Sequence, residues 1–237
     1  MLRPFSYLLT NEPPAPTGIA FIDIKAHHMQ TWLPIFPLQL IIFPGEKVNL
    51  HIFEPRYKQL ITEIRASGSP FGVPPVIGGE MKMAGTVVEL REIVRIYPDG
   101  RMDIRCMGTD PFRMEDIHRP CLGKLYDCAR TERLQVQMTG DPDKNQRIIE
   151  MLTDFYKSLD IQKGLPSADA TGLSYLIGHR IGLKPEDEFQ LLIEPSETKR
   201  QDMIISHLET FIPNAKQQIE IQQRAQLNGH FRKIDSI

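Results

Sequence analysis

The stretch Gly85-Thr-Val-Val-Glu-Leu-Arg-Glu-Ile-Val-Arg-Ile-Tyr-Pro-Asp-Gly-Arg-Met-Asp-Ile-Arg-Cys106 contains the clearest structural pattern in this 237-residue chain. Its first half, to Tyr97, is rich in the β-branched residues that favour strands. Pro98-Asp-Gly100 then predicts a turn, because Asp-Gly supplies the positive-φ residues that a tight turn requires. Apolar and polar residues alternate on the way back. Residues 85–106 are therefore predicted to form a β-hairpin.

The residues before this hairpin predict short strands and one helix. Apolar or alternating segments that indicate strands lie at 33–36, 40–43, 48–52 and 71–77. Pro55 opens the helix at a position where proline is tolerated. Apolar side chains then recur with helical spacing at Tyr57, Leu60, Ile61 and Ile64. The segment 67–70, Ser-Gly-Ser-Pro, ends this helix.

After the hairpin, two further strands are expected at 111–117 and 122–129, and the periodicity then changes. Beyond Gly140-Asp-Pro142, apolar residues recur every three or four positions, which predicts four helices. Their stripes or starts lie at 148–159, 173–181, 185–188 and 204–212. A β-rich half followed by a helical half indicates an α+β fold. We expect a Pro-rich N-terminal extension (1–31), a β-domain (32–140) and an α-helical bundle subdomain (141–237).

Composition argues against several classes of partner. The first 140 residues hold 16 basic and 15 acidic side chains and the rest hold 12 and 15, so neither half is polarised enough for nucleic acid or an anionic membrane. Cys106, Cys121 and Cys128 form no C-x-x-C pair, and the simplest interpretation is buried thiols in a reducing cytosol. We find no signal peptide and no run of about 18 apolar residues. A cytoplasmic protein without membrane contact is expected.

Several strings, taken in order, resemble the amino-terminal domain of Lon proteases. They are Leu33-Pro-Ile-Phe-Pro-Leu38, Phe43-Pro-Gly45, Leu50-His-Ile-Phe-Glu-Pro-Arg-Tyr57, Phe71-Gly-Val73 and Ile181-Gly-Leu-Lys-Pro-Glu-Asp-Glu-Phe-Gln-Leu-Leu192. The resemblance covers roughly residues 32–212 and implies a PUA-like β-pseudobarrel followed by a C-terminal α-helical bundle. In Lon this domain engages substrate proteins and precedes an ATPase and a protease domain. The resemblance thus implies a protein-binding module, adaptor- or chaperone-like, whose partners are other proteins or unfolded polypeptides.

Motifs for catalysis are missing from the sequence. No G-x-x-x-x-G-K-[ST] loop is present to cradle ATP, and the serine–lysine protease domain of Lon is absent. Ser174 and Ser206 lie within helical stripes, and there is no G-x-S-x-G motif. His27-His28 have no neighbour with ligand spacing, so no metal is expected. We therefore expect a protein that is not an enzyme and needs no cofactor.

The string Glu54-Pro-Arg-Tyr57 is explained structurally as a helix start in which Tyr57 enters the core. On the opposite face of the same helix, Arg56, Gln59 and Glu63 must point away from the apolar stripe. They are the candidate protein-binding residues. The alternative for these three side chains is an ordinary solvated helix face.

Two other functions compete with protein binding. PUA-like barrels also occur in RNA-binding proteins, but RNA binding requires clustered basic residues, and here Glu89-Leu-Arg-Glu-Ile-Val-Arg95 interleaves them with acids. Nucleic acid is therefore an unlikely partner, although distant residues could converge in the fold. An ATP-independent peptidase needs a nucleophile beside a base, and no spacing predicts one. We expect a monomer or a weak homodimer.

Overall fold

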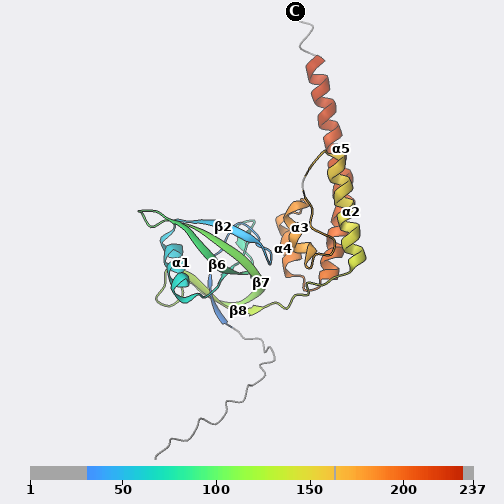
Figure 1. The fold of residues 1–237 in the computed structure, drawn as a ribbon. Helices are drawn as coiled ribbons and strands as arrows, with labels where there is room; N and C mark the ends of the chain where they lie inside the picture. Colours follow the sequence, from blue (N-terminus) through green and yellow to red (C-terminus); the bar gives the residue numbers. More distant parts are fainter. Residues whose placement is uncertain (1–30, 163, 232–237) are drawn as a thin grey trace, which may run out of the picture.

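The computed structural model describes residues 31–162 and 164–231, which form a β-barrel and a group of helices (Figure 1). The barrel strands are β1 (Thr31–Ile35), β2 (Lys47–Ile52), β3 (Phe71–Val73), β6 (Ala84–Ile96), β7 (Met102–His118) and β8 (Asp127–Arg133). They form one mixed sheet in the order β2-β7-β6-β3-β1-β8, and β8 also pairs with β7, which closes the sheet on itself. A small ribbon pairs β4 (Val76–Ile77) with β5 (Glu80–Met81). The α+β prediction is confirmed.

The extents of several strands differ from the sequence prediction. The predicted hairpin is present as β6 and β7, but β7 continues to His118 and includes the strand expected at 111–117. The strand expected at 122–129 begins only at Asp127, because a turn occupies the residues before it. The expected strand at 71–77 is divided into β3 and β4, and residues 40–43 form no strand. In these places tertiary packing outweighs local strand preference.

Two β-bulges change the pattern of side chains along β6. Arg91 and Val94 are extra residues that interrupt the register with β7. Bulges bend a strand and increase its twist. Leu90 before the first bulge, Ile93 between the two and Ile96 after the second are opposite Cys106, Ile104 and Met102 of β7. The apolar positions of β6 therefore recur every third residue.

The helix α1 (Pro55–Ser67) packs its predicted stripe into the largest core of the barrel. Tyr57, Leu60, Ile61 and Ile64 are all buried, together with inward side chains of β6 and β7. Gly68 ends the helix in the left-handed conformation, with φ of 69°, and its N–H donates to the Ile64 carbonyl. This is the conformation in which glycine terminates helices at least cost.

The second half of the chain is helical, as predicted. Its elements are α2 (Pro142–Ser158), α3 (Leu173–Ile177), the 3-10 turn η1 (Gly178–Arg180), α4 (Pro185–Ile193) and α5 (Glu197–Phe231). Residues 214–227 are Gln-rich with few apolar positions, yet α5 continues through this region and extends beyond the other helices (Figure 1). Residues 1–30, which make up nearly all of the Pro-rich extension, lie outside the described residues.

A buried polar network holds the helices together. The Arg200 side chain on α5 is fully buried and pairs with Glu197, with 2.6 Å between Nη2 and Oε2. Its Nε donates to Ser174 Oγ of α3 at 2.9 Å, and its Nη2 donates to the Gln137 carbonyl at 2.6 Å. The guanidinium also lies 4.2 Å from the ring centroid of Tyr175. Such a pair is tolerated inside a protein only when its polar atoms are bonded.

The segment 40–43, expected as a strand, instead joins the barrel to the helices. The ring of Phe43 inserts among buried helical side chains and lies 5.4 Å from the ring of Tyr175 and 4.5 Å from that of His179. Gly178 makes this approach feasible, because a Cβ at that position would overlap the Phe43 ring. The close approach requires a residue without a side chain.

An ion-paired histidine lies at the same joint. His179 Nδ1 is 2.8 Å from Glu188 of α4, and its Nε2 is 3.2 Å from Glu46 of the barrel. The bond with Glu46 contributes most to raising the pKa of His179 to about 9, against a smaller opposing effect of burial. The imidazolium therefore connects the two halves of the chain at neutral pH.

This raised pKa predicts a specific pH dependence of stability. A pKa higher in the folded than in the unfolded state, where histidine titrates near ~6.5, stabilises the fold fully below about pH 6.5 and loses that effect as the pH rises through about 9. Urea unfolding of the wild type and of His179→Gln should therefore differ more at pH 6 than at pH 9.5. An equal difference at both values would contradict this role for His179.

Candidate functional site

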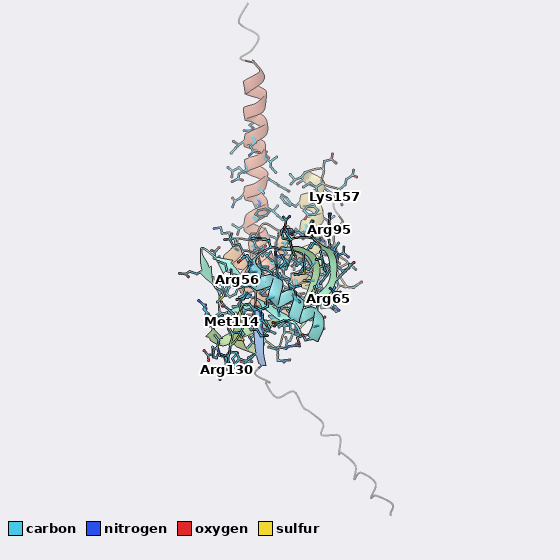
Figure 2. The ribbon with its side chains drawn as sticks, turned by 90° about the vertical axis from the view of Figure 1, so that its left-hand side faces the viewer. Arg56, Arg65, Arg95, Met114, Arg130 and Lys157 are labelled. Carbon is cyan, nitrogen blue, oxygen red and sulfur yellow. A yellow bond between two sulfur atoms is a disulfide. The ribbon has the colours of Figure 1, made fainter. Side chains whose placement is uncertain are left out.

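The outer face of α1 holds the three candidate residues that the sequence pattern selected. In Figure 2 this helix faces the viewer, and Arg56 lies toward one end of it while Arg65 lies toward the other. Arg56 pairs with Glu54, with 2.9 Å between Nη2 and Oε2, and lies over the ring of Tyr57. Arg56 is therefore occupied by its own neighbours at the start of the helix.

Gln59 and Glu63 form a second group, which holds the loop between β7 and β8. The side chains bond to each other at 3.1 Å, and Gln59 Oε1 accepts from the Leu125 N–H at 2.9 Å. Glu63 accepts from Lys124 Nζ at 2.9 Å and from the Tyr126 hydroxyl at 2.5 Å. The bond from Tyr126, followed by that from Lys124, lowers the pKa of Glu63. These two candidates therefore fix a loop against α1, which sequence spacing could not show.

The same loop corrects the prediction for the cysteines. Cys121 and Cys128 form a disulfide, whereas three free thiols were expected. Only Cys106 is free among the three, and burial raises the pKa of its thiol to about 12. The disulfide encloses a turn at Leu122-Gly123, in which Gly123 has φ of 71°. This turn leaves the Leu122 side chain 94% exposed.

Two hollows flank the C-terminal end of α1. The first, of about 620 Å³, lies between α1 and β6. Its lining combines apolar residues with charged ones: Ile64, Arg65, Gly68, Ser69, Glu89, Leu90, Arg91, Glu92, Ile93 and Ile96. The helical spacing of apolar residues predicts Ile64 in the core, but no sequence pattern selects the β6 residues as a site. Because of the bulges, the apolar residues of β6 recur every third position. A strand is normally recognised by alternation of apolar and polar residues, so this face was not identified.

The second hollow, of about 680 Å³, opens on the other side of the same helix end. Its walls come from α1, from β1, β6 and β8, from the loop before β8 and from the α1–β3 connection. They are mainly apolar: Trp32, Leu33, Pro34, Glu63, Ile64, Ser67, Ser69, Pro70, Val87, Tyr126, Thr131 and Arg133. Glu63 and Tyr126, which bond to each other, form part of the wall. The candidate residue Glu63 thus lines this hollow, whereas Arg56 and Gln59 line neither of the two.

The family model for the ATP-dependent protease La (LON) substrate-binding domain matches residues 32–210. The chain belongs to the Lon substrate-binding domain family. Among solved structures, a Lon N-terminal domain protein from Xanthomonas campestris aligns with a TM-score of 0.58 at 22% identity, over 74% of this chain and 98% of that one. The N-terminal domain of the Mycobacterium avium complex Lon protease aligns with a TM-score of 0.60 at 14% identity, over 76% and 99%. The comparison with curated proteins found no match.

The other side chains of this Lon-family domain that could act in catalysis or bind a metal are bonded to neighbouring residues or lack the necessary ligand set. Ser174 Oγ donates to Glu197 at 2.6 Å and accepts from Arg200, but Ser174 is fully buried, so no substrate reaches it. His51 of β2 bonds to Asp103 of β7 on the exposed surface of the barrel. Within 31–162 and 164–231, no group of three His, Cys, Asp or Glu could hold a metal ion, and His27-His28 lie outside these ranges. None of the helices described is long and apolar enough to cross a membrane.

Proposed function

We propose that this chain is a non-catalytic polypeptide-binding module, adaptor- or chaperone-like, that holds exposed segments of other proteins. The observation that carries the proposal is the pair of hollows beside α1, of about 620 and 680 Å³, in a domain of the Lon substrate-binding family. Both volumes fall within the ~300–1,000 Å³ of ordinary ligand clefts. Their mixed apolar and charged lining suits side chains of varied sequence, because apolar contact is non-directional.

In this proposal the module binds polypeptides and catalyses no reaction. It is a monomer or weak homodimer, and it consists of a PUA-like barrel and an appended helical subdomain. The sequence lacks a phosphate-binding loop of the G-x-x-x-x-G-K-[ST] type. We infer a cytoplasmic location from the family alone. The cysteines no longer support it, because Cys121 and Cys128 are joined, and disulfides persist chiefly in oxidising compartments.

The ion pairs on the β6–β7 hairpin favour polypeptide over RNA as the ligand. Arg91, Arg101 and Arg105 each pair with a carboxylate, from Glu89, Asp99 and Glu92 respectively. These three arginines therefore offer little uncompensated positive charge to phosphate groups, which supply most nonspecific affinity for nucleic acid.

The proposal is tested by fluorescence anisotropy with one labelled protein in two forms, chemically unfolded and folded, without nucleotide. We expect binding of the unfolded form, at least about tenfold weaker binding of the folded form, and no cleavage of either. Single-stranded RNA at moderate salt is the parallel probe and should not bind. Binding of RNA without binding of the unfolded protein would contradict the proposal.

A further inference from the structure

The strand β6 has an open edge beside α1. On one side β6 pairs with β7 along its length, but on the other side β3 pairs only with residues 86–88. Within the described ranges, no strand pairs with this second side of residues 89–96. An unpaired edge offers backbone N–H and C=O groups to an added strand, which is a common way of binding extended peptides.

The hollow of about 620 Å³ lies against this edge and has an apolar floor. Ile64 is buried in the barrel core, and Leu90 and Ile93 pack against the same core. Ile96, at the end of β6, is 55% exposed although it lines the hollow. Apolar side chains of a bound segment would therefore cover surface that water now contacts, which favours association.

The charged rim of the hollow has one cation without a carboxylate. Glu89 pairs with Arg91 at 2.8 Å, and Glu92 pairs with Arg105 at 2.5 Å. Arg65, in the last turn of α1, has no ion-pair partner in the part of the chain that the structure describes. The rim therefore attracts a carboxylate to Arg65.

The bulges at Arg91 and Val94 limit how a segment can add to this edge. Bulges are one device by which proteins protect edge strands from continuous pairing. A bound segment can thus form only a short hydrogen-bonded ladder with β6, and its side chains on the apolar floor must supply much of the affinity.

We propose that the hollow between α1 and β6 receives an extended segment of unfolded polypeptide, with its apolar side chains on the Ile64–Leu90–Ile93–Ile96 floor and a carboxylate at Arg65. This inference rests on the proposed function and names its site and the class of segment bound. The bound segment pairs with the β6 edge over a few residues. Peptides that favour the extended conformation therefore bind better than those containing proline.

The test uses the full chain and a fluorescein-labelled ten-residue peptide in which Ile or Val alternates with Thr, with one Glu. Ile96→Asp should raise its Kd about tenfold or more, as expected for a central apolar contact. Met83→Asp is the matched control: Met83 is 48% exposed, precedes β6 outside the 89–96 edge and does not line the hollow, so the Kd of this variant should change less than about twofold. Both positions are exposed, so the variants should fold.

A second variant tests the charge at the rim. Arg65→Glu should reverse the preference between the Glu peptide and one with Lys in its place, by roughly two- to fivefold for an exposed pair. Equal effects of Ile96→Asp and Met83→Asp, or an unchanged Glu/Lys preference, would overturn this inference. Binding of unfolded protein by the wild type would in that case still uphold the proposed function, whereas its absence would refute both.

Discussion

Arg200→Met should lower the free energy of unfolding by about 3–5 kcal/mol, because it leaves the buried Glu197 carboxylate without its partner. The substitution also removes the donors to Ser174 and to the Gln137 carbonyl. Urea denaturation followed by circular dichroism measures the change. The helices would be affected first, since the network joins α3 and α5 to the segment that enters α2.

The matched control for this prediction is an exposed ion pair that joins α2 to α5 on the surface of the helical half. Arg147→Met removes the pair between Arg147 and Glu209, whose side chains are both more than half exposed. Exposed pairs of this kind contribute at most about 1 kcal/mol. A loss in Arg200→Met no larger than that in Arg147→Met would contradict the structural role assigned to the buried network.

Phe43→Ala should cost about 3–5 kcal/mol, the usual range for removing a buried phenylalanine ring. Phe43 belongs to the barrel half but packs among the helices, so its loss should also weaken the coupling between the two halves. Trp32, the only tryptophan, lies on β1 and reports on the barrel, whereas circular dichroism reports mainly on the helices. The two unfolding transitions should coincide in the wild type and separate in the variant.

Phe53→Ala serves as the control, because Phe53 is 60% exposed next to the same barrel. It should change stability by no more than about 0.5 kcal/mol and leave the two transitions together. If Phe43→Ala behaved in the same way, Phe43 could not be the residue that couples the stability of the barrel to that of the helices.

The sequence predicted those elements whose signals are local. The Asp-Gly turn identified the hairpin, Pro55 and the four-residue stripe identified α1, and Pro185 with its acidic neighbours identified α4. Each signal lies within a few residues of the element it defines. The period of these patterns depends on backbone geometry, so it can be read without knowing the tertiary fold.

What the sequence could not predict depends on contacts between distant residues. Gln59 and Glu63 were selected because they oppose the core stripe, yet their bonds with Leu125, Lys124 and Tyr126 span more than 60 positions. Their role in binding a partner stays a prediction. The Cys121–Cys128 disulfide was missed because spacing alone does not reveal which cysteines meet.

The hollow beside β6 was missed for a related reason. Its floor combines Ile64 from α1 with residues about 30 positions later in the sequence. The bulges at Arg91 and Val94 also interrupt the alternation of apolar and polar residues by which the apolar face of β6 would be recognised. Which strand edge stays open depends on where β3 ends, and that is a property of the assembled sheet.

Hydrogen–deuterium exchange of the full chain, with and without a chemically unfolded polypeptide, tests the central claim most directly. Backbone amides on the open edge of β6, within residues 89–96, should exchange fast in the free protein because no strand covers them. Bound polypeptide should slow exchange there and at the end of α1. Unchanged exchange at both places, with protection confined to the helical half or found nowhere, would contradict the account.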